Sequence, residues 1–321
     1  MPLLEIDDLK TYFFTKQGTV KAVDGVSLKL DPGQTLGIVG ESGSGKSMTC
    51  LSVMKLIPTA GRIAGGRIVF EGRDLSALSA TEIRRIRGKE IGMVFQDPMT
   101  SLNPFLRIGE QVAEPLIVHD GLSRRAARQR AVEMLDKVGI PEPSRSLEEF
   151  PHRFSGGMRQ RVMIAMALIT RPKLLIADEP TTALDVTIQA QVLELFRKVK
   201  AELGMSLVLV THNLGIVAGM ADRVAVMYAG RVVEYAATDD LFSNPRHPYT
   251  QALLRAVPRL GDTAASLAPI AGSPPNLAHL PAGCSFYERC PLREDRCRTE
   301  PPPLEPVSEG HLASCWVNAA R

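Results

Sequence analysis

The sequence lacks an apolar run long enough to cross a bilayer. Its most apolar helical stretch, residues 162–170, is far shorter than the roughly 20 residues that a membrane helix needs. The acidic start, residues 1–8, also lacks the apolar core of a secretion signal. We therefore expect a chain that is not exported and that would act at a membrane only through separate subunits.

The sequence also lacks a large excess of either sign of charge. The formal net charge is only +3, and no long basic tract is present, so nucleic acid is not expected as a partner. The Arg-rich stretches at residues 84–87 and 124–130 are more simply explained as solvated helix faces. A hydrophobic content of 45% over 321 residues is enough to bury a sizeable core.

The clearest motif is a phosphate loop at residues 40–47, which fits the pattern G-x-x-x-x-G-K-[S/T]. A strand-like run at residues 36–39 precedes the loop and a helix-forming run at residues 47–56 follows it, so a chance match on a surface loop is disfavoured. Lys46 is predicted to bridge the β- and γ-phosphates of a nucleotide, and Ser47 to bind Mg²⁺. The predicted nucleotide contacts in and after the loop are Gly40, Ser42, Gly43, Ser44, Gly45, Lys46, Ser47 and Met48.

Two further segments carry groups that suit a nucleotide. Ser155, Gly156 and Gly157 open a predicted helix, where a hydroxyl, unobstructed N–H groups and a positive helix end favour phosphate. Asp178 and Glu179 follow a continuous apolar strand and lie at its carboxyl end, where α/β sheets place ligands. Asp178 is predicted to hold Mg²⁺ and Glu179 to polarise the attacking water. Solvated carboxylates are the alternative for this pair.

With these residues and motifs in this order, the chain resembles the nucleotide-binding subunit of ATP-binding cassette (ABC) transporters. Residues 174–179 resemble the family's Walker B strand, and residues 155–158 resemble its signature, although Phe154 and Met158 depart from the usual Leu and Gln. The remaining motif residues are Gln96 (Q-loop), Asp185 in 183–185 (D-loop), His212 (H-loop) and Tyr12, with Phe13 or Phe14 as alternatives (the aromatic that stacks on adenine).

The resemblance implies an α/β fold: a P-loop NTPase cassette with a RecA-like parallel sheet core, an antiparallel β layer, a helical subdomain and a C-terminal extension. The expected domains are a catalytic core at residues 1–97 and 161–240, a helical subdomain at 98–160 and an extension at 241–321. Strands are expected at residues 3–14, 20–30, 173–177 and 206–211, a hairpin turn at 229–230, and helices at 123–139 and 186–203.

The resemblance also implies a head-to-tail pair of ATPase subunits that hydrolyse ATP with Mg²⁺. Ser155 and Gly157 would then contact the γ-phosphate bound to the partner, and His212 would hold the γ-phosphate in its own subunit. Gln96 would sense Mg²⁺ and the attacking water. The implied catalytic residues are Glu179, His212 and Gln96, and the implied Mg²⁺ ligands are Ser47, Gln96 and Asp178.

The tail narrows the expected substrate. Residues 244–254 resemble the tail of ATPase subunits from dipeptide and oligopeptide importers, and residues 20–26 and 101–104 fit the same subfamily. Peptide import is the leading hypothesis; import of nickel or another solute, an ATPase of iron–sulfur assembly and a nonhydrolysing subunit are the alternatives. The implied partners are two transmembrane permease subunits, a second ATPase chain (a heterodimer is preferred) and a solute-binding protein reached through the permease. The chain would lie peripherally on the cytoplasmic face, with residues 97–104 as the expected permease contact.

Four of the five cysteines fall in this tail, at Cys284, Cys290, Cys297 and Cys315. Their spacing lacks the Cys-x-x-Cys element typical of zinc, and a cytosolic setting disfavours disulfides. The tail is rich in proline and poor in periodic apolar residues, so a cross-link would stabilise it. The family resemblance implies a 4Fe-4S cluster held by all four thiolates, with zinc or free thiols as alternatives. A structural or regulatory role is expected.

Overall fold

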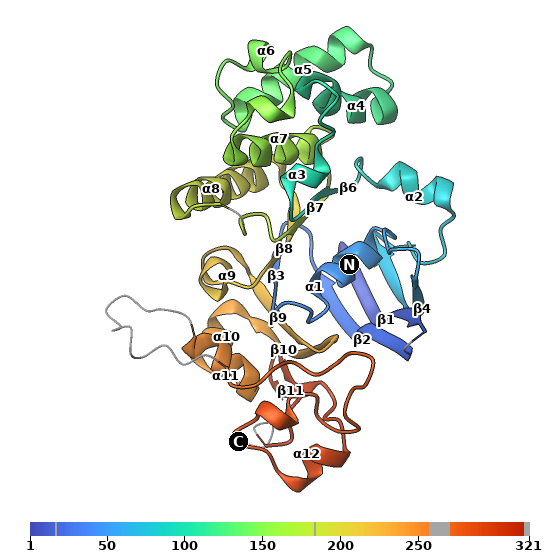
Figure 1. The fold of residues 1–321 in the computed structure, drawn as a ribbon, viewed down its shortest axis with the longest axis vertical. Helices are drawn as coiled ribbons and strands as arrows, with labels where there is room; N and C mark the ends of the chain where they lie inside the picture. Colours follow the sequence, from blue (N-terminus) through green and yellow to red (C-terminus); the bar gives the residue numbers. More distant parts are fainter. Residues whose placement is uncertain (17, 183, 257–269, 318–321) are drawn as a thin grey trace. The chain divides into compact units, whose positions relative to one another are not determined.

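The computed structural model describes residues 1–321 except 17, 183, 257–269 and 318–321 (Figure 1). The chain divides into two compact units. The first unit consists of Met1–Ala77 and Leu209–Arg321, and the second of Leu78–Val208. Both units carry residues that the sequence assigns to nucleotide binding.

An antiparallel sheet in the first unit has the strand order β2-β1-β4-β5. Its strands are β1 (Leu4–Thr15), β2 (Gly18–Leu30), β4 (Gly61–Phe70) and β5 (Arg73–Asp74). Alternate side chains of the second half of β2 are buried, as expected for a strand with one face on the core. The predicted strands at 3–14 and 20–30 are confirmed to within two residues.

The second sheet of this unit contains the neighbouring strands β11-β12-β10-β9-β3. β3 (Thr35–Val39) runs parallel to β9 (Arg223–Tyr228), and all five of its residues are buried, as in a strand covered on both faces. β10 (Arg231–Ala237) pairs antiparallel with β9, and the predicted turn at residues 229–230 joins them.

The helix after the phosphate loop, α1 (Lys46–Val53), is shorter than the predicted 47–56. The amide of Met54 still donates to Cys50, but Lys55 has a positive φ of 48°, which the right-handed helix cannot contain. Pro58 lies beyond this break and therefore does not itself end the helix.

The C-terminal extension, residues 241–321, contributes more regular structure than its composition suggested. Its helices are α11 (Pro248–Arg255) and α12 (Asp295–Thr299), with α10 (Thr238–Ser243) at its start and a 3₁₀ turn, η3 (Tyr287–Arg289). β11 (Glu305–Ser308) and β12 (His311–Ala313) form a hairpin that pairs with β10 and so extends the main sheet. The sequence did not predict this hairpin, because each strand is too short to show a period.

A buried carboxylate joins the extension to β10. Glu234 is fully buried, and its two carboxylate oxygens accept hydrogen bonds from the amides of Arg246 and His247 at 2.6 and 2.8 Å. Its Oε1 also lies 2.7 Å from Nε2 of His311 on β12. Three groups therefore satisfy a carboxylate that would be unfavourable in the core without partners.

His247 in this network caps α11. Its Nδ1 accepts the amide of Tyr249 at 3.0 Å, so the ring must be unprotonated at that nitrogen. Burial lowers the pKa of His247 to about 4, against the opposing pull of the Glu234 charge. Because the unfolded chain binds this proton near pH ~6.5, the contribution of His247 to stability is present above that pH and is lost as the pH falls towards 4.

We expect His247→Asn to reduce the acid sensitivity of the fold. The asparagine carbonyl can accept the same amide as a helix cap but does not titrate. Between pH 7 and pH 5, the free energy of unfolding should fall by about 2 kcal/mol more in the wild type than in the variant. Urea unfolding at the two pH values measures this difference. Equal losses would show that His247 is not the group responsible.

The second unit contains the parallel strands β6 (Ile91–Val94) and β7 (Leu174–Asp178) and most of the helices. The helices are α2 (Ala80–Ile86), α3 (Pro98–Ser101), α4 (Ile108–Asp120), α5 (Arg124–Lys137), α6 (Pro143–Ser146), the 3₁₀ turn η1 (Pro151–Arg153), α7 (Gly156–Leu168) and α8 (Val186–Leu203). The predicted helix at 186–203 is confirmed, and Gly204 caps it. The predicted strand at 206–211 is confirmed as β8 (Ser206–Thr211), and the boundary between the two units falls within this strand.

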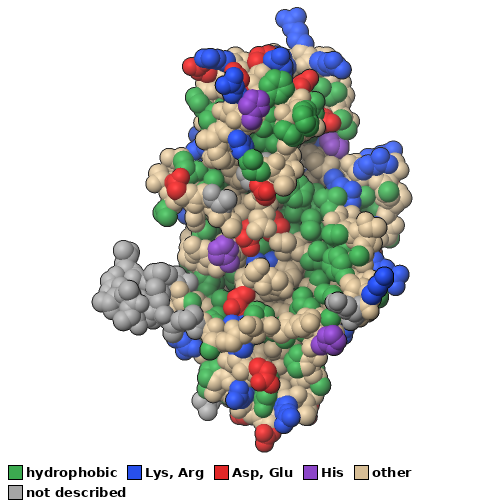
Figure 2. Space-filling view, viewed as in Figure 1, with side chains coloured by type: hydrophobic (Ala, Val, Ile, Leu, Met, Phe, Trp, Pro, Cys, Tyr) green, Lys and Arg blue, Asp and Glu red, His purple; other side chains and the backbone are tan. Residues whose placement is uncertain are grey.

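None of the helices in the described part of the chain is both long and apolar enough to span a membrane. On the face that Figure 2 shows, Lys and Arg side chains are scattered among acidic and uncharged groups.

Candidate nucleotide site

The phosphate loop lies in the first unit and is packed against backbone on two sides. A Cβ on Gly45 would lie 2.5 Å from the carbonyl oxygen of Ala22 on β2, and a Cβ on Gly40 would lie 2.2 Å from that of Met227 on β9. Both glycines also have positive φ, at 103° and 153°. Only glycine satisfies both requirements, so these positions fix the path of the loop.

The turn between β9 and β10 holds the loop by hydrogen bonds. The amide of Gly230 donates to the carbonyl of Ser44 at 3.0 Å, and the carbonyl of Gly230 accepts the amide of Asp24 at 2.8 Å. One residue thus connects the phosphate loop to β2. The sequence predicted the turn but gave no sign that it supports the loop.

The polar groups of the loop suit a phosphate. The Lys46 ammonium is buried and donates to the carbonyls of Gly40 and Glu41 at 2.8 and 2.9 Å, which keeps it over the loop. The Ser44 hydroxyl is buried and has no hydrogen-bond partner among the described residues. A phosphate oxygen is the kind of acceptor that such a hydroxyl would take.

The three competing aromatic residues on β1 have different surroundings. The Tyr12 hydroxyl donates to Asp24 at 2.5 Å, Phe13 lies against Gly61, and the Phe14 ring lies under the guanidinium of Arg62 at 4.4 Å. Tyr12 is therefore the one whose ring is fixed by a hydrogen bond, although the role in adenine stacking stays a prediction.

Asp24 also accepts two hydrogen bonds from Arg231, at 2.7 and 3.2 Å. Burial acts to raise the pKa of Asp24, but the hydrogen bonds from Tyr12 and Arg231 outweigh it and keep that pKa below its usual value. Burial and the bond to Asp24 raise the pKa of Tyr12. The pair therefore stays as a phenol and a carboxylate at neutral pH.

In the second unit, Glu179 follows β7 with a φ of 46°, an uncommon conformation for a residue other than glycine. Its Oε2 accepts hydrogen bonds from Nε2 of Gln96 at 3.2 Å and from Oγ1 of Thr182 at 2.9 Å. The structure thus brings together two of the predicted catalytic residues. Asp178, immediately before, is buried. Strain at such a position is typical of functional sites.

The signature segment, residues 155–158, forms the start of α7 as predicted. Ser155 caps this helix by accepting the amide of Met158 at 3.3 Å. A Cβ on Gly157 would lie 3.0 Å from Cγ2 of Ile188, so α8 supports the signature turn. Ile188 is half-buried beneath this glycine.

Asp185 begins α8, where its carboxylate accepts the amide of Ile188 at 2.9 Å. Ala183, from the same predicted D-loop, lies outside the described residues. His212 follows β8 in the first unit and has an exposed side chain. The first unit therefore carries Tyr12, the phosphate loop and His212, and the second carries Gln96, the signature segment, Asp178, Glu179 and Asp185.

We expect Glu179→Gln to slow ATP hydrolysis by about 100-fold, as the loss of a general base typically does, while ATP still binds. The amide keeps the size of the carboxylate but is a much weaker base. Steady-state turnover and nucleotide affinity measured side by side test this. Glu194→Gln is a matched control, since Glu194 forms an exposed pair with Arg197 on α8. Undiminished turnover by Glu179→Gln would contradict the assignment.

The four tail cysteines lie in the first unit, where their charges affect one another's pKa values. Burial, together with the charges of Cys297, Cys290 and Cys315, raises the pKa of Cys284 to about 11. The amide of Cys284 also donates to the carbonyl of Cys297 at 2.8 Å. No group of three or more His, Cys, Asp or Glu in the described residues is arranged to hold a metal ion. The donor type thus suits a metal or cluster, but the thiols are not in a ligating arrangement.

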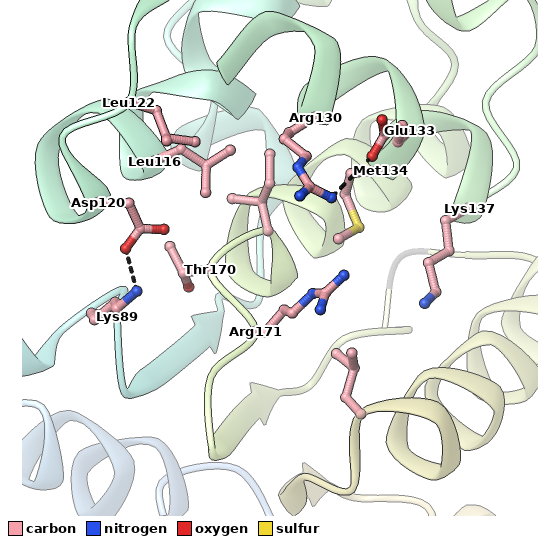
Figure 3. Close-up of a pocket in the computed structure, with 12 residues that line it drawn as sticks. Lys89, Leu116, Asp120, Leu122, Arg130, Glu133, Met134, Lys137, Thr170 and Arg171 are labelled. Carbon is pink, nitrogen blue, oxygen red and sulfur yellow. Dashed lines mark hydrogen bonds and ion pairs between the residues drawn. The ribbon is translucent and has the colours of Figure 1, made fainter. Parts of the chain in front are cut away.

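A pocket of about 470 Å³ in the second unit lies among the ends of α4, α5 and α7 (Figure 3). Lys89 and Asp120 pair across its edge, and Arg130 pairs with Glu133 at 3.3 Å. Its lining contains none of the predicted nucleotide contacts, so it is separate from the candidate site.

Comparison with known sequences finds two families on the chain. The family described as "ABC transporter" matches residues 23–182, and the one described as "Oligopeptide/dipeptide transporter, C-terminal region" matches residues 233–297.

The chain is also similar to curated proteins over almost its whole length. It is 52% identical over 314 residues to the oligopeptide transport ATP-binding protein OppD of Salmonella typhimurium, covering 98% of this chain and 93% of the relative. It is 51% identical over 320 residues to the dipeptide transport ATP-binding protein DppD of Bacillus subtilis, covering 99% and 96%.

Solved structures show the same cassette fold. A bacterial ABC transporter cassette, solved as a dimer, is 30% identical with a TM-score of 0.66, covering 73% of this chain and 98% of the solved one. A post-hydrolysis state of a cassette bound to ADP and Pi gives the same TM-score at 29% identity, with the same coverage. These likenesses confirm the predicted α/β cassette.

Proposed function

Because this chain belongs to the ATP-binding proteins of oligopeptide and dipeptide ABC transporters, we propose that it hydrolyses ATP to drive peptide import through separate membrane permease subunits. The observation that carries the proposal is near full-length similarity to peptide-transport relatives, tail included, on a chain with an intact phosphate loop. These relatives favour peptides over the nickel and iron–sulfur-assembly alternatives.

In the proposed reaction, the phosphate loop binds the triphosphate through its N–H groups and Lys46. Ser47, Gln96 and Asp178 would hold Mg²⁺ through oxygen atoms, and the ion would neutralise charge on the phosphates. Glu179, oriented by Gln96, positions and polarises the attacking water, and His212 holds the γ-phosphate. Catalysis then consists mainly of positioning and electrostatic stabilisation.

A second ATPase chain completes each site in this proposal. The signature segment, residues 155–158, serves the nucleotide of the partner, and Asp185 belongs to the contact between the two chains. A related but different partner chain is preferred over a second copy. Two permease subunits bind the helical subdomain at residues 98–160, with residues 97–104 as the contact, and a solute-binding protein delivers peptide from the other side.

The same proposal assigns the catalytic core to residues 1–97 and 161–240 and the extension to 241–321. The whole chain lies on the cytoplasmic face of the membrane, because ATP is available there. Exposed apolar side chains at Phe95, Met99 and Phe105, exposed by 38%, 63% and 86%, support a protein contact near residues 97–104.

Uptake of labelled peptide by the assembled transporter in proteoliposomes tests the function. We expect uptake to require ATP on the side that carries this chain, and Lys46→Ala to abolish both uptake and tight ATP binding. Lys55→Ala is a matched control, since Lys55 lies just after α1 and contacts the Ser76 carbonyl instead. ATP turnover without peptide uptake, with nickel uptake instead, would contradict the substrate class.

The four tail cysteines suggest that the extension holds a metal ion or a metal cluster. We propose that Cys284, Cys290, Cys297 and Cys315 hold a 4Fe-4S cluster, with zinc as the competing occupant. Support comes from four thiols of a proline-rich segment that lie close enough for their charges to raise the pKa values of Cys284 and Cys290. The group would cross-link the segment, and the thiols would have to lose the protons that their raised pKa values favour.

Anaerobic purification followed by iron, acid-labile sulfide and zinc assays decides this. We expect about four irons and four sulfides per chain, and Cys297→Ser should lower both the iron content and the melting temperature. Cys50→Ser is the control, since Cys50 is buried on α1 and far from the tail in sequence. A colourless, metal-free protein of full stability would refute the cluster.

A further inference from the structure

We propose that the C-terminal extension sets the ATP affinity of the phosphate loop through Arg289, a positioning residue that holds Glu41. Glu41 is the first residue after Gly40 in the loop. Nη1 and Nη2 of Arg289 donate to Oε2 and Oε1 of Glu41 at 2.6 and 2.9 Å, a two-pronged ion pair. The inference rests on the proposed function only in that the loop must bind ATP.

Contacts other than the one with Glu41 also hold the Arg289 guanidinium in place. The Arg289 side chain is only 4% exposed. Its Nε donates to the carbonyl of Ala271 at 2.9 Å, and Nη1 also contacts the Tyr228 hydroxyl at 3.3 Å. Nη2 also donates to the carbonyl of Ile270 at 3.4 Å. A planar guanidinium with these three contacts has one orientation, so it presents its two remaining N–H groups to Glu41 in a defined place.

A second residue of the extension holds the backbone at the same position. The Tyr249 hydroxyl accepts the amide of Glu41 at 2.8 Å. Tyr249 is fully buried, and its ring packs against those of Tyr228 and Phe286, with centroids 4.6 and 5.4 Å apart. The extension therefore holds both the backbone and the side chain of Glu41.

The negative charge of Glu41 connects its ion pair with Arg289 to the binding of ATP. A carboxylate on a loop that receives a triphosphate repels the ligand unless a cation neutralises it. Arg289 is the cation that pairs with the Glu41 carboxylate, whereas Lys46 contacts the Glu41 carbonyl, and the Glu41 side chain is 28% exposed, so water screens it only in part. Removing Arg289 alone leaves the negative charge at the loop and also frees the Glu41 side chain to move.

Arg289 directly precedes Cys290, and the 3₁₀ turn η3 ends at Arg289. The fold of the cysteine-containing tail therefore decides where the guanidinium lies. The sequence offered no sign of this link, because 248 positions separate Arg289 from Glu41.

The test measures the ATP affinity of the full-length chain by competition with a fluorescent ATP analogue, together with thermal melting without nucleotide. We expect Arg289→Gln to weaken ATP binding on the order of 10-fold, a usual size for coupling between a site and a distant contact. Arg289→Lys, which keeps the charge but not the fork, should lose less. Arg296→Gln is the control, because Arg296 forms an exposed pair with Glu300 within the same tail.

A double variant separates charge neutralisation from general support of the fold. Glu41→Gln combined with Arg289→Gln should bind ATP more tightly than Arg289→Gln alone, because the uncompensated charge is gone. An equal or weaker affinity of the double variant would overturn the proposal, as would unchanged affinity in Arg289→Gln. If Arg289→Gln does not fold, unchanged affinity in Arg289→Lys and Tyr249→Phe overturns it. Failure of the wild type to bind ATP would instead contradict the proposed function.

Discussion

The close approach of the phosphate loop to the backbone of β2 and β9 is the constraint on which the rest of the nucleotide-binding unit depends. Gly40 and Gly45 have no room for a side chain, and the carbonyl of Ser44 is bound by Gly230. Because backbone atoms rather than flexible side chains define these contacts, the loop has little freedom before ligand arrives. A pre-ordered set of N–H groups loses less entropy on binding phosphate.

The C-terminal extension restricts the phosphate loop further through its contacts with Glu41. Glu234 ties the start of the extension to β10, β12 pairs with β10, and the aromatic rings of Tyr228, Tyr249 and Phe286 fill the space between them. The extension is thus part of the core of the first unit. Its contacts with Glu41 connect the part of the chain that matches the oligopeptide/dipeptide transporter C-terminal family to the predicted phosphate loop.

Local sequence signals predicted much of this structure. Residues 186–203 and 206–211 were predicted to the residue, because an amphipathic period, a glycine cap and an apolar run are all local. The helix after the loop was predicted too long, since the left-handed Lys55 leaves no sequence signal. The β11–β12 hairpin and the Arg289–Glu41 pair were missed, because both arise from contacts between distant segments.

The candidate site also combines residues that the sequence predicted with contacts that it did not predict. The family resemblance pointed to Gln96, and the apolar strand that precedes Glu179 pointed to that residue. The structure places Nε2 of Gln96 3.2 Å from Oε2 of Glu179. Two residues that support the motifs belong to no motif themselves: Ile188 beneath Gly157 and Gly230 beside Ser44. The sequence did not predict their contacts, because these contacts form only when the chain folds.

A high-resolution structure of the full-length chain with Mg²⁺ and a nonhydrolysable ATP analogue tests the central claim most directly. The account predicts phosphates bound by the amides of residues 43–47, with the Ser44 hydroxyl engaged and the Arg289–Glu41 pair intact beside them. A nucleotide bound elsewhere, or a Glu41 side chain released from Arg289 when the phosphates enter, would contradict it.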